Sequence, residues 1–504
     1  MKSTNVIAVD LGASSGRLIS GTYDGNKITL KEQFRFSNLP VQVVNDLNWD
    51  YIKILQEIKY GLSIAHQDLD SLDSLNVDTW GVDYGLLNTH GQLLMAPHSY
   101  RDNRVNQFED QLYDIISPFE LFKLTGNQPA KINSILQLYS DLQLNPFLKT
   151  EVAHVLFMPN LIGYFLTGKI QNEFTISSTS GLLDTDSRDF SSTVFKQLGF
   201  QSAWFGTLAK GGVELGPISK AIQQELNLDR ELKVITGVGH DTAAALLALP
   251  IAPVDKEDVA FISSGTWSII GRQTPKPVVS QAAFDSGLTN EGCFDGSNRL
   301  LANLTGLWIV QELQREWSYK GEVVEFGKMV EDALSVQSID SYIDPNNELF
   351  TAPNQMEEKI KAYLKETGQK LPKNRGELIL LVLESLAFSY KKIIENLETV
   401  TNKPITKIHM FGGGIQNRLL VQLTANFTQK EVVAGPVEAS VMGNIVSQLL
   451  VSGSLSLKDS QSVLENSFDA QHIQPATVSD LTKKYQLFNQ VTQNKDIDFD
   501  EGGV

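Results

Sequence analysis

Residues 6–36, VIAVDLGASSGRLISGTYDGNKITLKEQFRF, give the clearest indication of the fold class. Apolar, β-branched runs alternate here with turns, and the DGN turn at 24–26 predicts a hairpin, so we expect three antiparallel strands. A second stretch, VAFISSGTWSIIGR at 259–272, has the same order of strand, small-residue turn and strand. Any two hairpins look alike, but one opens the chain and the other follows the linker IAPVDKED at 251–258. The sequence therefore favours an α/β protein whose two domains follow one plan.

Composition narrows the class of protein. The 504 residues fit three domains of roughly 150 residues or two larger ones. The formal charge is 42 − 59 = −17, and such a field repels phosphate backbones, so we expect no nucleic-acid partner. The single cysteine, Cys293, excludes an intrachain disulfide and a thiolate zinc site, which favours a cytoplasmic location. The longest apolar stretch, 378–388, is broken by Glu384 and is shorter than the ~20 residues of a membrane span, so we expect no membrane partner.

The remaining pattern alternates strands and helices. Helical spacing begins at 51–67, and 105–170 is mostly helical; 74–88 reads as a strand, a turn and a second strand. The other expected elements are a buried strand at 231–239, a helix starting at 240, helices at 304–319 and 376–398, a strand entering a glycine loop at 405–414, and a helix at 415–427. From about 455 the chain is more polar, and its end reads as a frayed acidic tail.

The turn of the first hairpin is a candidate anion site. Its sequence, Asp10-Leu11-Gly12-Ala13-Ser14-Ser15-Gly16-Arg17, offers backbone N–H groups, hydroxyl donors and a delocalised charge. Asp10 ends a buried strand, where it could hold Mg²⁺ directly or through water. The sequence is neither a Walker A loop nor a GxGxxG fingerprint, and a tight polar hairpin explains it equally well.

Two further turns could contact a nucleotide. Gly265-Thr266 joins the strands of the second hairpin, where an ordinary turn is the structural alternative. Gly412-Gly413-Gly414 lies between a strand and a helix; three glycines permit close contact with a ligand, and a helix N-terminus suits anions. A simple strand–helix turn needs one glycine at most.

The segment Gly239-His240-Asp241-Thr242 places a carboxylate where a helix begins. Asp241 at or near the N-cap could face an acceptor hydroxyl, and the helix dipole should keep it ionised. Capping alone is the structural alternative, and His240 alone reads as a packed or capping residue. Trp80 beside Gly81 and Asp83 is typical of a polyol pocket, although core packing also explains the indole.

Taken together, the chain resembles the FGGY family of carbohydrate kinases over residues 4–450. The matching motifs are DLGASSGR (10–17), DTWGVDYGLL (78–87), YRDNR (100–104), GHDTAAA (239–245), SSGTWS (263–268), NLTGLWIVQ (303–311) and FGGGIQN (411–417). ASSGR, TWGVDYGLL and NLTGLW point to the branch that phosphorylates L-rhamnulose. Many members carry Trp-x-Asp-x-Arg where this chain has Tyr100-Arg101-Asp102-Asn103-Arg104, so the contribution of this segment to sugar choice is open.

The resemblance implies two actin-like, ribonuclease-H-like domains with ATP in the cleft between them. The sugar-binding domain is expected at 1–250, the nucleotide-binding domain at 251–455 and a C-terminal extension at 456–504. The resemblance implies that Asp241 is the catalytic base and that Asp10 binds Mg²⁺. It implies that ATP is bound by Ala13, Ser14, Ser15, Gly16, Arg17, Thr266, Gln311, Gly412, Gly413 and Gly414. It implies that the sugar is bound by Gly81, Asp83, His240, Asp241, Thr242 and Asn303.

The implied reaction is ATP-dependent phosphorylation of L-rhamnulose at its 1-hydroxyl, with ATP and Mg²⁺ as cofactors, in a monomer or homodimer. Three alternatives remain at this point. The chain could act on xylulose, fuculose or glycerol; it could be an actin-like or Hsp70-like ATPase; or it could be a sugar sensor without turnover. The Trp80–Asp83 segment does not suit an ATPase, and the intact Asp10, Arg17 and Asp241 do not suit a sensor.

Overall fold

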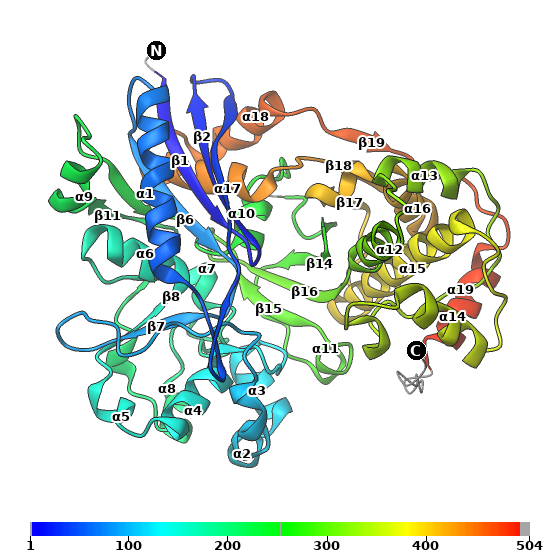
Figure 1. Cartoon of the computed structure of the whole chain (residues 1–504), viewed down its shortest axis with the longest axis horizontal. Coiled ribbons are helices and arrows are strands. Elements are labelled where there is room, and N and C mark those ends of the chain that lie inside the picture. The colour runs from blue at the N-terminus through cyan, green and yellow to red at the C-terminus, as the bar shows by residue number, and fades with distance from the viewer. Residues whose placement is uncertain (1–2, 253, 494–504) are drawn as a thin grey trace. The chain divides into compact units, whose positions relative to one another are not determined.

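The computed structural model describes residues 3–252 and 254–493 of the chain (Figure 1). By their internal contacts the residues form two compact units. The first consists of Met1–Pro253, Gln273–Leu300 and Glu438–Asp469, and the second of Val254–Arg272, Leu301–Val437 and Ala470–Val504. The domain boundaries expected from the sequence at 250 and 455 stay a prediction.

The first unit is built on a six-stranded sheet. Its order is β11-β12-β6-β1-β2-β3, with bounds Val213–Pro217, Lys233–Thr236, Ser74–Thr79, Thr4–Leu11, Ser15–Tyr23 and Ile28–Ser37. The strands β1, β2 and β3 form the expected antiparallel meander, while β6 and β12 run parallel to β1. The expected helix at 51–67 is α1 (Tyr51–Asp68), which packs on β2 and β3.

Side-chain alternation gives the two faces of this sheet different partners. On β1, Ile7, Val9 and Leu11 join the apolar core that α1 and α6 (Met158–Thr167) also enter. Asp10 and its neighbour on β6, Asp78, therefore lie on the opposite face. The strand–turn–strand expected at 74–88 forms, but its strands do not pair with each other, because β7 (Tyr84–Leu87) pairs with β8 (His154–Phe157).

The second face of the sheet is covered by α17 (Ala439–Val451), which packs against β1, β6 and α10 (Asp241–Leu247). Polar side chains of α17 bind the sheet: Asn444 Nδ2 donates to Asp78 Oδ2 at 2.5 Å, and Gln448 Nε2 donates to the Ile7 carbonyl at 3.0 Å. The helices approach so closely that a Cβ on Gly443 would overlap the Ala244 backbone. This helix thereby supports both Asp78 and the middle of α10.

A second sheet, most of whose strands belong to the second unit, repeats the order of the first. It reads β15-β16-β14-β13-β17-β18-β19, with bounds Thr289–Gly292, Asn298–Thr305, Trp267–Thr274, Val259–Ser264, Lys407–Phe411, Glu431–Ala434 and Gln471–Ile473. As with β2 and β1, β14 is antiparallel to β13, and two parallel strands and an antiparallel edge strand follow. The two hairpins singled out in the sequence thus occupy equivalent places in two sheets.

Helices complete the second unit. They are α12 (Trp308–Tyr319), α13 (Phe326–Leu334), α14 (Met356–Glu366), α15 (Arg375–Thr401), α16 (Arg418–Thr428) and α19 (Leu481–Val491). The expected apolar helix at 376–398 is α15, which is buried along most of its length and packs on α13 and α16. Within the described residues, no helix combines the length and the hydropathy that a bilayer crossing requires.

The C-terminal extension contains regular structure. Its first helix, α18 (Leu457–Ser467), contacts β3, and β19 adds a strand to the second sheet. The acidic tail expected at 493–504 lies, apart from Gln493, outside the described residues.

Candidate functional site

Two carboxylates stand side by side on the first sheet. Asp10 and Asp78 are partners in the parallel register of β1 and β6, and both are buried. Asp78 Oδ2 accepts from Asn444, while its Oδ1 is buried and has no hydrogen-bond partner. Burial raises the pKa of Asp78 well above its ordinary value, and the charge of Asp10 raises it further. The pair therefore favours a bound proton or a cation.

This donor set fits Mg²⁺. A hard divalent ion takes oxygen ligands and needs one or two carboxylates beside the phosphates of a nucleotide. Asp10 supplies one carboxylate, the one singled out in the sequence, and Asp78 supplies a neighbouring oxygen that lacks a partner. The described residues contain no cluster of three or more His, Cys, Asp or Glu side chains suited to hold a metal by themselves.

Arg17 is already paired. Its Nη2 donates to Asp10 Oδ2, and its Nη1 lies 2.6 Å from Glu438 Oε2. Burial would lower the pKa of Arg17, but these two carboxylates raise it, so the guanidinium stays charged. Ser440 Oγ also donates to Asp10, at 3.2 Å. An incoming phosphate would meet a side chain that Asp10 and Glu438 hold in place.

The turn between β1 and β2 contains both buried and solvent-accessible residues. Gly16 is buried under Phe36, and a Cβ there would overlap the ring, so its small size serves packing. Ser14 is exposed, while Ala13 and Ser15 are half-buried. Asn38 fixes the turn, because its Nδ2 donates to the Gly12 carbonyl at 2.8 Å. Ser14 is therefore the most accessible residue of this turn, and Ala13, Ser15 and Arg17 are accessible in part.

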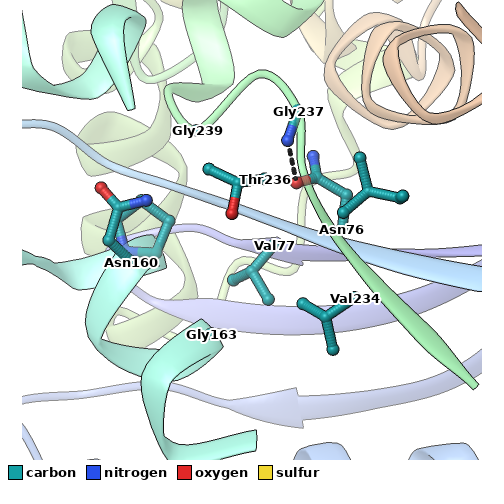
Figure 2. A pocket seen from close by; sticks show the side chains of 10 residues that line it. Asn76, Val77, Asn160, Gly163, Val234, Thr236, Gly237 and Gly239 are labelled. Carbon is teal, nitrogen blue, oxygen red and sulfur yellow. Dashed lines mark hydrogen bonds between the residues drawn. The ribbon is translucent and has the colours of Figure 1, made fainter. Parts of the chain in front are cut away.

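The loop before Asp241 is held from two sides. Asn76 on β6 accepts from Gly237 N and donates to the Val238 carbonyl, both at 3.0 Å; the first of these bonds is visible in Figure 2. Glu173 and Thr175 each accept from Gly239 N at 3.2 Å. The small cavity in Figure 2 is lined by Gly237 and Gly239 of this loop and by residues of β6, β12 and α6, and its volume of about 10 Å³ has space for about one water molecule.

Asp241 is the first residue of α10, and His240 occupies the cap position before it. Asp241 Oδ1 accepts from Thr242 N at 2.5 Å and Thr242 Oγ1 at 3.0 Å, and it lies 3.0 Å from His240 Nδ1. Burial would raise the pKa of Asp241, but the His240 charge and the Thr242 donors lower it below its usual value. The ionised state that the sequence attributed to a helix dipole is thus explained by these neighbours.

His240 is more than the packed or capping residue that the sequence suggested. Besides Asp241, its ring faces Glu291 through Nε2, at 3.5 Å. Burial alone would lower the pKa of His240, but the two carboxylates raise it to about 9. This pKa predicts that the buried ring is protonated on both nitrogens at neutral pH.

Asp83 is the centre of the expected sugar segment. Its Oδ2 accepts from the indoles of Trp49 and Trp80 at 2.6 and 2.9 Å and from Tyr100 N at 3.1 Å. Its Oδ1 accepts from Gln137 Nε2 at 3.1 Å. Burial raises the pKa of Asp83 to about 6 despite these donors.

Most acceptor positions of Asp83 are therefore filled by the protein itself. The carboxylate fixes two indole rings, whose centroids lie 4.0 Å apart. Gly81 packs against Thr179, where a Cβ would lie 3.1 Å from Oγ1. The segment that departs from the family pattern contributes here, since Tyr100 contacts Asp83 and Arg104 Nη2 donates to Gln137 Oε1 at 3.1 Å.

In the second unit, the expected nucleotide residues gather at the β13–β14 turn. Thr266 Oγ1 donates to Gln311 Oε1 at 3.0 Å. Gly414 packs on Ser264, and Gly412 has a positive φ of 86° and lies against the Ser264 carbonyl. A Cβ on Gly413 would have no atom within 4 Å, so this glycine is the open member of the triplet. Asn303, on β16, is exposed.

One detail of the glycine loop differs from expectation. The helix expected at 415–427 begins only at Arg418, because a 3₁₀ turn, Gly413–Gln416, comes first and α16 is capped by Asn417. The Asn417 side chain accepts from Leu420 N at 3.1 Å, so it occupies the donor that an anion at the helix start would use.

Comparison with known proteins assigns the chain to a family. The N-terminal domain model of the FGGY family of carbohydrate kinases matches residues 5–248, and the C-terminal domain model matches residues 260–451. The chain belongs to the FGGY family of carbohydrate kinases. The resemblance read from the motifs is thereby confirmed.

Curated relatives and solved structures agree with this membership. A rhamnulokinase of Bacteroides thetaiotaomicron is 36% identical, covering 89% of this chain and 91% of its own. A rhamnulokinase of Enterobacter sp. is 33% identical, and the match covers 99% of this chain and 100% of the relative. The solved structure of gluconate kinase from Lactobacillus acidophilus superposes with a TM-score of 0.81 at 14% sequence identity, and the match covers 98% of this chain and 97% of that one. The structure of Plasmodium falciparum glycerol kinase with ADP gives a TM-score of 0.79 at 15% identity and covers 99% of each chain. The fold is the pair of actin-like, ribonuclease-H-like domains that the FGGY motifs implied.

Sequence reasoning missed several residues of this FGGY kinase. They are Trp49, Asp78, Gln137, Glu291, Arg299 and Glu438. Asp78 had a usable signal, because it ends a strand-like run as Asp10 does, and parallel strands end at one edge of a sheet. Trp49 and Gln137 had none, since only long-range packing brings them to Asp83.

Proposed function

We propose that the chain transfers the γ-phosphoryl group of ATP to the 1-hydroxyl of L-rhamnulose, giving L-rhamnulose 1-phosphate and ADP. The observation that carries the sugar assignment is the identity of 33–36% to rhamnulokinases over 89–99% of this chain. The observation that supports the chemistry is Asp241, an ionised carboxylate at the start of α10 whose side chain is 35% exposed.

In this proposal Asp241 orients the hydroxyl. The three donors around Asp241 all fall on Oδ1, so Oδ2 is the oxygen that can accept from the sugar. A carboxylate with a lowered pKa is a weak base, which is adequate because the transition state of phosphoryl transfer is loose and the hydroxyl proton leaves late. As the new O–P bond forms, the bond to the β-phosphate oxygen breaks, ADP leaves, and the proton passes to Asp241.

The remaining predicted residues bind and orient the substrates. Gly81, Asp83, His240, Thr242 and Asn303 are proposed to contact the sugar. ATP is proposed to contact Ala13, Ser14, Ser15, Gly16 and Arg17 in the first unit and Thr266, Gln311, Gly412, Gly413 and Gly414 in the second. Asp10, with Asp78 beside it, would hold Mg²⁺, which offsets phosphate charge when bound. A cytoplasmic location belongs to the same proposal.

A coupled ADP-release assay tests the assignment. The purified chain is given MgATP with L-rhamnulose, xylulose, fuculose or glycerol, or with no sugar. We expect the highest kcat/KM with L-rhamnulose and little ADP release without sugar. A higher kcat/KM for another member of the panel overturns the sugar assignment. Sugar-independent hydrolysis supports an ATPase, and sugar binding without turnover supports a sensor.

A further inference from the structure

A second charged group lies behind the proposed base, in the same unit. Arg299, on β16, is fully buried, and its Nε and Nη2 lie 3.1 and 2.5 Å from Glu291 Oε2. Its Nη1 donates to the Gly292 carbonyl. Arg299 therefore fixes both the side chain and the backbone at the end of β15, where Glu291 lies.

Glu291 in turn faces His240. The His240 ring has Asp241 Oδ1 3.0 Å from Nδ1 and Glu291 Oε2 3.5 Å from Nε2, and the Thr79 carbonyl is 3.4 Å from Nδ1. Every one of these partners is an acceptor, and they face both ring nitrogens. Only the doubly protonated ring offers a donor to each side.

The four side chains balance in charge. Along the contacts the order is Asp241, His240, Glu291 and Arg299, so carboxylates and cations alternate. His240 lies between two carboxylates, and Glu291 lies between two cations. Burial would raise the pKa of Glu291, yet Arg299 and His240 lower it to about 2. The charge of Asp241 also raises the pKa of Asp10, on β1, and that of Asp78, on β6, so negative charge on these three carboxylates is mutually unfavourable. His240 is the cation in contact with Asp241 that offsets this charge.

We propose that Glu291, fixed by Arg299, is a positioning residue that holds His240 as an imidazolium against Asp241, and that this contact sets the orientation of the catalytic carboxylate. The inference rests on the proposed function. Because His240 and Thr242 engage Oδ1, Oδ2 is directed to the sugar hydroxyl. Without Glu291, His240 loses one of its two anionic partners and the carboxylate loses a fixed neighbour.

Histidine NMR tests this without any sugar. The chain is labelled with ¹³C-histidine, and the His240 signal is identified as the one missing from His240→Gln. We expect the wild-type ring to titrate near pH 9, as the pKa of about 9 indicates. In Glu291→Gln we expect a midpoint at least about one pH unit lower, since an opposite charge at this distance shifts a pKa by about 1–3 units. Glu291→Asp, which keeps the charge, should retain part of the shift.

The kinetic test uses the same variants. Glu291→Gln should lower kcat with L-rhamnulose by about tenfold, because a positioned base contributes roughly 10²–10⁴-fold and this variant loses only a part of its positioning. The KM for ATP should stay within about twofold of the wild-type value. Its activity should also decline at a lower pH on the alkaline side than that of the wild type. Glu214→Gln, which removes an exposed pair with Lys233, is the matched control and should change neither readout.

The outcomes separate the two proposals. A wild-type His240 that is neutral at pH 7, or a midpoint unchanged in Glu291→Gln, overturns the inference. If Glu291→Gln does not fold, the His240 titrations of the wild type and of Glu291→Asp still test the inference. If the titrations agree with expectation but L-rhamnulose is not phosphorylated, the proposed function fails and the ion-pair arrangement stands. If kcat is unchanged despite a shifted midpoint, the positioning role is wrong.

Discussion

Asp10 and Asp78 are register partners on two adjacent parallel strands, and this places two buried carboxylates side by side. Like charges on buried neighbouring side chains destabilise each other unless a proton or a cation lies between them. The arrangement explains why the strand β6, and not only the turn after β1, matters for the proposed Mg²⁺ site.

The first prediction concerns Asp10. Asp10→Asn keeps the size of the side chain but removes the carboxylate, so we expect kcat to fall by about 10²-fold or more and its dependence on Mg²⁺ concentration to weaken. Steady-state rates over a Mg²⁺ series, with calorimetry of MgADP binding, measure both effects. Asp68→Asn, which removes an exposed pair with Lys31, is the control and should behave as the wild type. An unaltered Mg²⁺ response in Asp10→Asn would show that the ion is held elsewhere.

The second prediction concerns Asp241. Asp241→Asn preserves the contacts of Oδ1 in shape but removes the basic oxygen, so we expect kcat to fall by about 10²–10⁴-fold with ATP affinity within about twofold. Single-turnover rates and ATP titration by calorimetry separate the chemical step from binding. Turnover close to that of the wild type would reject Asp241 as the base.

The hairpins show what local sequence can establish. A hairpin depends on residues close in sequence, so β1–β2–β3 and β13–β14 could be predicted from apolar runs and turn residues. Position in the chain then suggested two domains that follow one plan, and the structure shows this plan as a repeated sheet order. The residue order within DLGASSGR and GHDTAAA likewise led to the family before any contact was known.

Contacts made across the chain could not be predicted in this way. Glu291 lies 50 residues from Asp241 in the sequence and reaches His240 only through the pairing of strands that carry it. The glycine triplet is similar: its sequence indicates close approach, but only the packing on Ser264 distinguishes Gly414 from Gly413. Local pattern identified the segments, and tertiary packing determined which residue in each is free to meet a ligand.

The third prediction uses that distinction. A Cβ on Gly414 would overlap Ser264 Oγ and approach its carbonyl, so Gly414→Ala should destabilise the fold by about 1–3 kcal/mol. Gly413→Ala meets no atom within 4 Å, so it should unfold as the wild type does but raise the KM for ATP several-fold if ATP lies on this loop. Thermal unfolding and ATP kinetics of the two variants give the comparison. Equal effects of both on ATP binding and stability would contradict the assignment.

The fourth prediction concerns Asp83. Four donors surround this carboxylate, so Asp83→Asn places an amide N–H₂ against groups that also donate. We expect a loss of about 1–3 kcal/mol in stability and a weakened sugar affinity, because the indoles of Trp49 and Trp80 lose their common acceptor. Chemical unfolding and the KM for sugar measure these effects. A variant with weakened sugar binding and unchanged stability would indicate that Asp83 contacts the sugar without supporting the indoles.

The last prediction concerns Glu384, a buried carboxylate on α15 that accepts from Ser338 Oγ at 2.7 Å. Burial raises its pKa to about 7. Between the unfolded value near 4.5 and about 7, the native state retains a proton that the unfolded chain has lost, so this group reduces stability as pH rises through that window. Glu384→Gln cannot ionise. Its unfolding free energy relative to the wild type should therefore increase from pH 4 to pH 8 by on the order of 3 kcal/mol. Urea unfolding at the two pH values, with the exposed Glu358→Gln as control, checks the sign; a difference that shrinks as pH rises would mean that Glu384 is ionised in the native state well below pH 7.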